Sequence, residues 1–328
     1  MRILKSALAL MLCACILLSF ASCGGKVSEK DFYAMDTFMT VTVYGRGGQN
    51  AVDKTVLAIN GVDAAYSISS ANGEIARLLR DGRIDSPSQG LLQMLECAKL
   101  LYERTNGAYD VSAYALYQLW RDCEKEGRVP GDSEIAAAKS LCGMDRITFD
   151  SNSVELNGVK GIDLGSIAKG YSGKAAAELL KAEDVSGALL VLGGNVVAYG
   201  CKPYGKTFRI GITDPLSTSA LCGSVEVADL SVVTSGKYNR RYEVDGTVYH
   251  HIIDVKSGYP CENGVASVTV VCDDGMWADA LSTALFLIGK DAALEYYKTY
   301  GGFEAVIVTD DGAITVTDGL KDSFTALR

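Results

Sequence analysis

The side chains best suited to chemistry lie in three segments, and the first of these is residues 161–171 (GIDLGSIAKGY). A short apolar strand that carries Asp163 turns through a glycine into a helix with Ser166 and Lys169 in its first turn. A helix start offers free N–H groups and the positive end of a dipole to an anion. The segment therefore predicts an anion site, although an ordinary capped helix with a surface lysine has the same pattern.

The second segment, 276–288 (MWADALSTALFLI), is the most apolar helix that the sequence predicts after residue 22. Asp279 and Thr283 are four residues apart, so they share one face of this helix. A buried carboxylate is unfavourable without a partner, and carboxylate and hydroxyl oxygens are ligands that Mg²⁺ accepts. The pattern fits a metal site, and it also fits an acid that stabilises the helix start, with Asp274 as the cap.

The third segment, 249–260 (YHHIIDVKSGYP), holds the only two histidines of the chain, His250 and His251. Successive side chains of a strand point to opposite faces, so at most one of the two rings faces a given site. An imidazole is the commonest general base, but a lone histidine is also often structural. The segment therefore supplies one candidate base.

The same segments contain parts of a different pattern. Ser166 and Lys169 form an S-x-x-K, and residues 256–258 form K-S-G, which are two of the three marks of penicillin-binding serine acyltransferases. The third mark, S-x-N, is absent between them, and this alternative leaves Asp279 without a role. Covalent labelling by a fluorescent penicillin would support it.

Composition limits the class of protein. The 328 residues are 48% hydrophobic and 22% charged, as in a globular protein, and they carry a net charge of −9. Without residues 1–22 the charge becomes −11, because that segment contains Arg2 and Lys5 but no acidic residue. An acidic chain argues against nucleic acid as a partner, and a phosphate ligand would need help from a metal ion.

Residues 1–22 have the pattern of a bacterial lipoprotein signal peptide. Arg2 and Lys5 precede 17 uncharged residues, and Ala21 and Ser22 precede Cys23. Cleavage would make Cys23 the lipidated N-terminus, carrying palmitate, with 23–30 as a linker to a domain at 31–328. An uncleaved anchor helix is the alternative, but 17 residues are few for crossing a bilayer. Both the cleaved lipoprotein signal and the uncleaved anchor place the domain on the extracytoplasmic face of the cell membrane, at the outer surface or in the periplasm.

Seven cysteines remain after Cys23, an odd number without a C-x-x-C pair. A disulfide framework would be even-numbered and would suit a smaller chain, so we predict mostly buried thiols. The seven are Cys97, Cys123, Cys142, Cys201, Cys222, Cys261 and Cys272.

Hydrophobic periodicity gives the elements that must position these groups. It predicts a strand at 38–44, helices at 49–65, 88–104, 112–126, 166–181 and 276–288, and a short helix after the capping residues Asp132 and Ser133. Strands dominate from residue 146 onward. Runs of helices and runs of strands predict an α+β fold with a largely antiparallel sheet.

Taken together, seven segments in chain order resemble the FAD:protein FMN transferases, the ApbE family. They span residues 34–284, which is most of the predicted domain. The segments are 34–37 (AMDT), 107–112 (GAYDVS), 163–171 (DLGSIAKGY), 192–195 (LGGN), 234–236 (TSG) with Tyr238 and Arg240, 251–254 (HIID) with Gly258 and Pro260, and 278–284 (ADALSTA).

The resemblance implies a fold, an activity and a site. The fold would be the family's α+β arrangement, related to tunnelling folds. The enzyme would split FAD, release AMP and join FMN to a Thr or Ser hydroxyl of a client protein, such as a redox-pump subunit or another exported flavoprotein. His251 would be the general base. Mg²⁺ would be held by Ser166, Asp279, Ser282 and Thr283, and the flavin nucleotide would be lined by Met35, Ser69, Ala108, Tyr109, Asp110, Asp163, Lys169 and Ile253.

The chain departs from the family pattern at three positions. Asp36 replaces a glycine, which adds a carboxylate near the nucleotide. Ser69 stands at an often aromatic position, where the loss of a stacking ring would weaken nucleotide contact by roughly 1 kcal/mol. Val255 replaces a proline.

Two alternatives to protein flavinylation remain open at this point. An open pocket at Ser69 could favour water as the acceptor, which would make the protein a Mg²⁺-dependent FAD pyrophosphatase that yields FMN and AMP. A flavin-binding lipoprotein without catalytic activity would leave FAD intact and would have no need of Asp279 and Thr283. Incubation with FAD and Mg²⁺, followed by detection of AMP, distinguishes a flavin-binding protein without catalytic activity from the two enzymes, because only the enzymes release AMP.

Overall fold

The computed structural model describes residues 26–328, which fold into layers of helix and antiparallel sheet. The predicted α+β class is confirmed. The predicted signal peptide at 1–22 and the predicted lipidation site Cys23 lie outside the described residues. Within residues 26–328, no helix has the length and apolar character needed to cross a bilayer.

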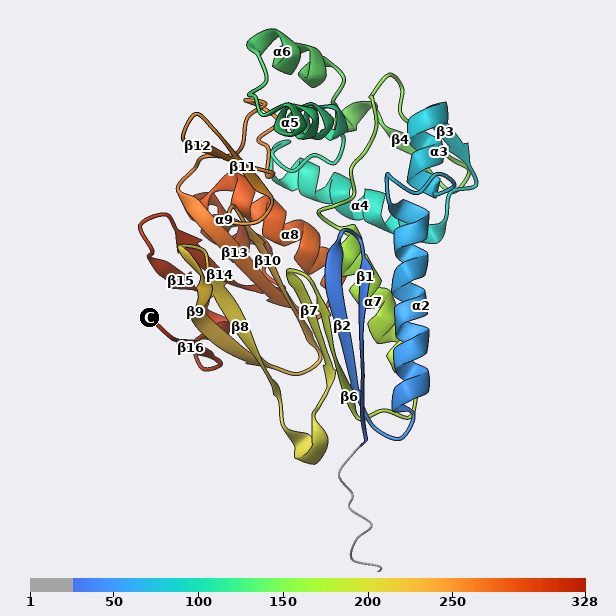
Figure 1. The fold of residues 1–328 in the computed structure, drawn as a ribbon, viewed down its shortest axis with the longest axis vertical. Helices are drawn as coiled ribbons and strands as arrows, with labels where there is room; N and C mark the ends of the chain where they lie inside the picture. The colour runs from blue at the N-terminus through green and yellow to red at the C-terminus, as the bar shows by residue number, and fades with distance from the viewer. Residues whose placement is uncertain (1–25) are drawn as a thin grey trace, which may run out of the picture.

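An eight-stranded sheet in the order β1-β2-β6-β7-β10-β13-β14-β15 forms the centre of the molecule (Figure 1). Every pair of neighbouring strands in it is antiparallel. Its strands are β1 (Val27–Ala34), β2 (Thr37–Tyr44), β6 (Gly187–Leu192), β7 (Asn195–Gly200), β10 (Leu230–Gly236), β13 (Val265–Cys272), β14 (Glu304–Thr309) and β15 (Ile314–Val316).

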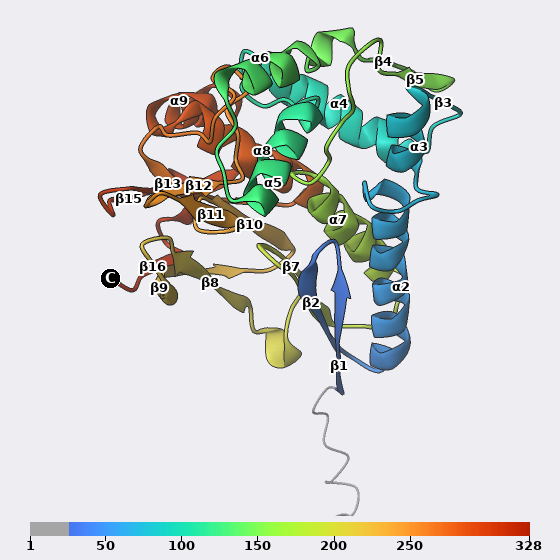
Figure 2. The ribbon, with the colours of Figure 1, turned by 45° about the horizontal axis from the view of Figure 1, so that its top comes forward.

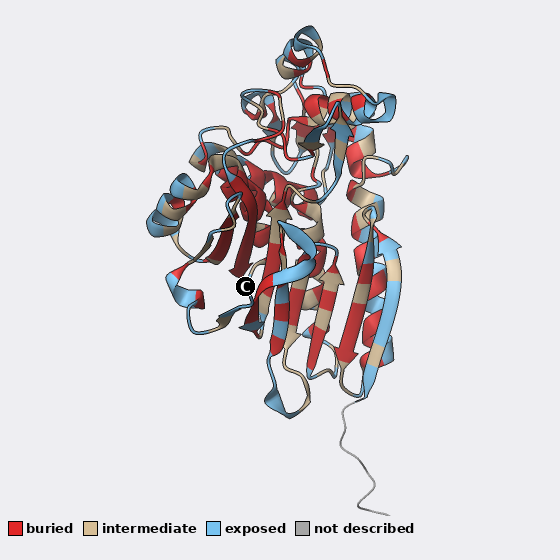
Figure 3. Cartoon of the chain, turned by 60° about the vertical axis from the view of Figure 1, so that its left-hand side comes forward, coloured by how far each residue is buried: buried red, intermediate tan, exposed pale blue. Residues whose placement is uncertain are grey.

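The chain enters this sheet earlier than the sequence predicts. The expected linker at 23–30 is wrong from Val27 onward, because β1 begins there and pairs with β2 along its whole length. Charged residues at 29–31 conceal the strand from a hydrophobicity pattern. They suit an edge strand, since charges there discourage pairing with other chains. Figure 3 shows β1 as a largely exposed strand beside the buried centre of the sheet.

Helices cover one face of the sheet and a second sheet covers the other (Figures 1 and 2). Val41 of β2 packs with Ile59 and Ala176 on the helical side, and Val271 of β13 packs with Phe208 on the opposite side. All eight residues of β13 are buried, as expected for a strand covered on both faces. The covering elements are α2 (Gly48–Tyr66), α7 (Ala168–Leu180) and α8 (Gly275–Ile288) on one side, and β8 (Phe208–Asp214), β9 (Ser217–Val227) and β16 (Phe324–Ala326) on the other.

The other helices and two small sheets gather around one end of the central sheet and around α8 (Figure 1). β3, β5 and β4 form one small sheet, and β11 and β12 form a hairpin. The elements are α3 (Glu74–Asp81), β3 (Arg83–Asp85), α4 (Gln89–Arg104), α5 (Tyr114–Glu126), α6 (Asp132–Ser140), β4 (Thr148–Phe149), β5 (Ser153–Glu155), β11 (Arg241–Val244), β12 (Thr247–His250) and α9 (Lys290–Tyr300), with short 3-10 turns at Met144–Arg146, Pro203–Gly205 and Asp318–Leu320.

The long predicted helices are confirmed, with ends shifted by two residues or fewer. Asp274 caps α8 as predicted, because its carboxylate accepts hydrogen bonds from the backbone N–H groups of Met276 and Trp277. The predicted caps of α6 are wrong. Asp132 and Ser133 are its first helical residues, and Glu134 closes the start by accepting from the N–H of Gly131.

The cysteine prediction is confirmed for the described residues. All seven cysteines from Cys97 to Cys272 are free thiols, and most are buried. Burial raises the pKa of Cys97 and of Cys272 to about 12, so both remain protonated and inert at neutral pH.

The close crossing of α7 and α8 depends on a glycine. A Cβ atom at Gly170 would lie 2.1 Å from the carbonyl oxygen of Gly275 and 2.5 Å from the Cβ of Asp279. Only a residue without a side chain therefore lets the two backbones approach this closely. The crossing brings the segment at 161–171 against the helix that carries Asp279.

We predict that Gly170→Ala lowers the free energy of unfolding by about 1–3 kcal/mol, because the added methyl group forces the two helices apart. Gly61→Ala is the matched control, since Gly61 lies within α2 and a Cβ there meets nothing within 4 Å. It should stabilise the protein by about 0.5–1 kcal/mol. Urea unfolding of both variants measures the difference, and equal effects would contradict this account of the crossing.

Candidate functional site

Asp279 is fixed at the crossing of α7 and α8. Its side chain is 3% exposed, and its Oδ2 atom accepts a hydrogen bond of 2.7 Å from the backbone N–H of Gly170. This bond offsets part of the cost of burying a carboxylate. Asp279 therefore does more than stabilise the start of its own helix. Its hydrogen-bond partner belongs to another helix, 109 residues away in sequence.

Three hydroxyl groups form a cluster at the next turn of α8 after Asp279. Ser282 donates to the backbone carbonyl of Asp279 at 2.9 Å, and Ser235 of β10 lies 2.8 Å from the hydroxyl oxygens of both Ser282 and Thr283. Thr283 follows Asp279 by one helical turn, so the two share a face as predicted. Ser235 was not predicted as a site residue, although it lies in the 234–236 motif.

Tyr109 links this region to the turn before α7. The ring is buried, and its hydroxyl lies 2.9 Å from the Oγ of Ser166. Burial raises the pKa of Tyr109 well above its usual value, so the phenol stays protonated. Ser166 itself precedes the helix, because α7 begins at Ala168 and the N–H of Ala168 bonds to Leu164. The predicted helix start at Ser166 is therefore two residues too early.

The groups predicted to bind a metal ion are all hard oxygen donors, and only one of them, that of Asp279, is a carboxylate. Among the described residues, no group of three or more His, Cys, Asp or Glu side chains could hold a metal ion. The predicted set differs in kind from such a cluster, since it combines Asp279 with the oxygens of Ser166, Ser282 and Thr283. Mg²⁺ suits a set of this kind, because it keeps several waters and takes only one or two carboxylates from the protein.

A cavity of about 100 Å³ lies beside the start of α7. Three predicted nucleotide residues line it, namely Met35, Asp163 and Lys169. Asp163 accepts from the N–H of Gly165 at 2.7 Å, and Lys169 donates to the carbonyl of Gly165 at 2.8 Å. The tight turn at Gly165 therefore holds the carboxylate and the ammonium in place.

The cavity also contains charged residues that were not predicted. Arg121 of α5 and Arg240 line it together with Lys169. The same walls carry three carboxylates, those of Asp36, Asp63 and Asp163. Arg240 is part of the 234–240 motif, so the sequence carried a signal for it. Arg121 carried none, since it is one exposed charge on an amphipathic helix.

The other predicted nucleotide residues lie apart from this cavity. Ser69 is exposed in the turn after α2, where its hydroxyl lies 2.8 Å from that of Ser67, a cavity residue. Asp110 is buried and accepts from the N–H of Ser112, and burial raises its pKa. The side chain of Ile253 packs in the core near Trp120, so only its backbone is free to face a ligand.

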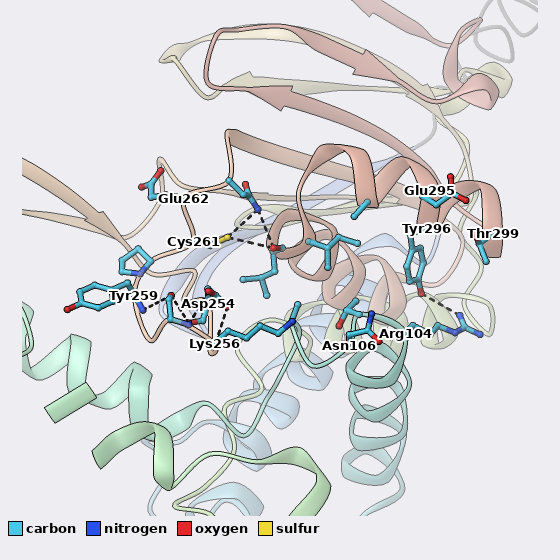
Figure 4. A pocket seen from close by; sticks show the side chains of 18 of the residues that line it. Arg104, Asn106, Asp254, Lys256, Tyr259, Cys261, Glu262, Glu295, Tyr296 and Thr299 are labelled. Atoms are coloured by element: carbon cyan, nitrogen blue, oxygen red, sulfur yellow. Dashed lines mark hydrogen bonds between the residues drawn. The ribbon is translucent and has the colours of Figure 1, made fainter. Parts of the chain in front are cut away.

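Ala108 lines a second, larger cavity of about 930 Å³ (Figure 4). Its walls come from the end of α4, the loop at 254–263 and α9. Arg104, Tyr259 and Tyr296 are among the side chains that face it. We place the chemistry at the smaller cavity despite its size, because Met35, Asp163, Lys169 and Arg240 of the sequence motifs converge there.

The two histidines have opposite environments, as their alternation predicts. His250 is 4% exposed, and its ring lies 3.1 Å from the carbonyl of Cys261 and accepts from the N–H of Ile252. Both ring nitrogens are used, so His250 is structural. His251 is exposed, and its Nδ1 lies 3.1 Å from the carbonyl oxygen of Asn239.

This contact fixes the tautomer of His251. A carbonyl oxygen only accepts, so Nδ1 carries the proton and Nε2 keeps its lone pair. The surrounding walls desolvate the ring and lower its pKa to about 4, and the nearby charges of Arg240 and Lys169 act in the same direction. His251 is thus a neutral base beside the cations of the smaller cavity.

Comparison with known proteins identifies relatives along most of the chain. The sequence model of the ApbE family matches residues 35–307. The FAD:protein FMN transferase of Treponema pallidum is 29% identical over 95% of this chain and 94% of its own length. That of Klebsiella pneumoniae is 32% identical over 73% of this chain and 75% of its own length.

Solved structures have the same fold. The ApbE protein of Thermotoga maritima has a TM-score of 0.82 and 29% identity, covering 91% of this chain and 99% of its own. The apo flavinyl transferase ApbE of Pseudomonas stutzeri has a TM-score of 0.76 and 28% identity, covering 91% of this chain and 97% of its own. The predicted fold family is therefore confirmed.

We predict that the ring of His251 titrates near pH 4, well below the ordinary value of 6.5. Its pKa is lowered in the folded chain, so the unfolded chain takes up a proton first as the pH falls. The contribution of His251 to stability is present above pH 6.5 and is lost as the pH falls toward about 4. NMR titration of the ring protons measures this pKa.

Arg240→Gln is the control for this titration. It should raise the pKa of His251 only part of the way toward 6.5, since desolvation is the larger cause and remains. A midpoint at 6.5 in the wild-type protein would contradict the described environment of the ring.

Proposed function

The chain belongs to the ApbE family, and from this membership we infer that it is an enzyme that transfers FMN from FAD to an acceptor protein. The observation that carries this function is the family match over residues 35–307. The site agrees with it, since motif residues from distant parts of the chain meet at one cavity. The alternative of a penicillin-binding acyltransferase loses its support, because Ser166 bonds to Tyr109 and Lys169 bonds to a backbone carbonyl.

The reaction requires one bond to form and one to break. An acceptor hydroxyl, which we propose to be that of a Thr or Ser, attacks the phosphorus of the FMN half of FAD. The P–O bond to the AMP half breaks, and AMP leaves with the electron pair. The hydroxyl loses its proton in this step, and it is a poor nucleophile until a base accepts that proton.

We propose His251 as this base. Its Nε2 lone pair is available because Nδ1–H donates to Asn239, and its lowered pKa keeps the ring neutral at the pH of the reaction. Lys169, Arg240 and Arg121 would offset the negative charge of the diphosphate. These cations are needed because the chain as a whole is acidic.

We propose that Mg²⁺ binds at Asp279 and Thr283, with Ser282 and an oxygen of Ser166 nearby. The support is the chemistry of the donors, which are one buried carboxylate and a group of hydroxyls at the crossing of α7 and α8. When bound, the ion would supply positive charge to the diphosphate and its leaving group. The Gly170 N–H bond holds the carboxylate in one orientation before any ion arrives.

We propose that the enzyme is a lipoprotein anchored through Cys23 to the extracytoplasmic face of the cell membrane. The sequence pattern at 1–23 supports this, and β1 begins only four residues after Cys23. The clients would be exported flavoproteins or redox-pump subunits, as the resemblance implies. Retention of a Cys23→Ser variant in the membrane fraction would oppose the anchor.

Hydrolysis of FAD to FMN and AMP is the second candidate, and one observation favours it. Ser69 is exposed in its turn, and its small side chain offers no ring to shield a bound nucleotide from water. Transfer and hydrolysis differ only in the acceptor. Mass spectrometry of a client protein after incubation with FAD separates them, since only transfer adds FMN to the client.

We predict that Asp279→Asn abolishes Mg²⁺-dependent release of AMP from FAD while the protein stays folded. The amide oxygen can still accept from the N–H of Gly170, but the negative charge that attracts the cation is gone. AMP release measured with added Mg²⁺ and with EDTA gives the readout. Asp279→Ala is the contrasting variant, and it should also cost about 1–3 kcal/mol of stability, because the buried N–H loses its partner.

Release of AMP by Asp279→Asn at the wild-type rate would contradict the proposed metal site. AMP release by the wild type that is unaffected by EDTA would contradict the need for a divalent ion.

A further inference from the structure

An exposed pair of aromatic rings lies at the tip of the β1–β2 hairpin. Tyr33 is 59% exposed and Phe38 is 80% exposed. The two residues are directly opposite in the hairpin, and their rings meet edge to face with centroids 5.3 Å apart. We call them the tip pair. Large apolar side chains that gather at the surface often mark a site of protein or membrane contact.

The tip pair stands out from the rest of the same hairpin face. The next pairs along that face are polar, since Thr40 donates to Asp31 at 2.6 Å and Thr42 donates to Glu29 at 2.7 Å. Alternate residues on the other face, such as Met39 and Val41, are buried in the core. Two polar pairs therefore separate the tip pair from the far end of the hairpin, where Val27 is the other exposed apolar residue on this face.

The hairpin tip is held rigidly. Met35 and Asp36 both have positive φ angles, of 49° and 56°, which gives the two-residue turn that suits the twist of a hairpin. An aspartate tolerates this conformation, which explains why Asp36 can replace the usual glycine. The N–H of Met35 also donates to a carboxylate oxygen of Asp63 in α2 at 3.1 Å. The tip pair is thus fixed relative to α2.

The turn that carries the tip pair is also a wall of the reaction cavity. Met35 and Asp36 line the smaller cavity together with Lys169 and Arg240. One strand pair, Ala34 and Thr37, separates the tip pair from these two turn residues. A macromolecule that contacts the tip pair would therefore lie next to the turn that lines the cavity.

We propose that the tip pair is the contact surface for the acceptor protein, which packs apolar residues next to its acceptor hydroxyl against Tyr33 and Phe38. This inference rests on the proposed transfer to a protein. A transferase with a protein acceptor needs a surface beside its cavity that the acceptor can recognise, and aromatic rings are the commonest anchors of such interfaces.

The position of the tip pair argues against a lipid surface as the occupant. The chain enters β1 at Val27, and the tip lies at the other end of this eight-residue strand (Figures 1 and 2). Tyr33 follows Val27 by six residues, so at about 3.3 Å per residue the tip pair is about 20 Å from the point of entry. An anchor that precedes Val27 would hold the opposite end of the hairpin to the membrane.

The test compares Tyr33→Ser/Phe38→Ser with Tyr204→Ser. Tyr204 is a matched control, because it is 84% exposed and lies in the turn between β7 and β8, outside the cavity walls. The probe is the soluble domain of a redox-pump subunit that carries the acceptor Thr. We expect kcat/KM for this domain to fall about 10- to 30-fold in the double variant, mainly through KM, and to change less than about twofold in the control.

Two further measurements define the outcome. The Kd for FAD and the rate of AMP release with water as the acceptor should be the same in all three proteins. The photocrosslinking residue p-benzoylphenylalanine should crosslink to the probe when placed at position 38 but not when placed at position 204. An unchanged KM for the probe would overturn the proposal, as would equal loss of FAD binding. Loss of binding to phosphatidylglycerol vesicles with an unchanged KM would overturn it in favour of a lipid contact. A wild type that binds FAD but labels no probe would instead refute the proposed function.

Discussion

The site depends on one buried interaction, the hydrogen bond from the backbone N–H of Gly170 to the carboxylate of Asp279. A carboxylate that is 3% exposed needs a partner, and here a second helix supplies it. The bond is possible only because residue 170 has no side chain, so the backbones of α7 and α8 can nearly touch. One glycine therefore sets both the packing of two helices and the orientation of the acid.

The antiparallel sheet brings the remaining groups to the same region. The turn between β1 and β2 carries Met35 and Asp36, and the segment after β10 carries Arg240. The two lie at the same cavity although β6 and β7 separate β2 from β10 in the sheet. The turn before α7 adds Asp163 and Lys169. Charges from distant parts of the chain thus surround one cavity, with the neutral ring of His251 beside two of the cations. A net acidic protein can in this way gather three cationic side chains at one cavity, whose walls also carry Asp36, Asp63 and Asp163.

Local patterns predicted the elements well, because strong periodicity and capping side chains such as Ser88 and Asp274 determine where helices begin. They failed where structure depends on tertiary contacts. The sequence predicts a linker in place of β1, because this edge strand carries charged residues. It also gives no sign that Arg121 belongs to the site, because only the packing of α5 brings this side chain to the cavity. The side chain of Ile253 lies in the core although its motif suggested a ligand contact. Motifs identify which residues matter, and only packing decides which atoms they present.

The central claim is that the oxygens at the crossing of α7 and α8 hold a divalent cation against the diphosphate of FAD. Anomalous diffraction from crystals soaked with FAD and Mn²⁺ tests it most directly, because Mn²⁺ replaces Mg²⁺ and can be located without ambiguity. The account predicts a peak in contact with the carboxylate of Asp279 and the hydroxyl of Thr283, next to the phosphates. Ordered FAD with no peak there, or with the cation bound elsewhere, would contradict it.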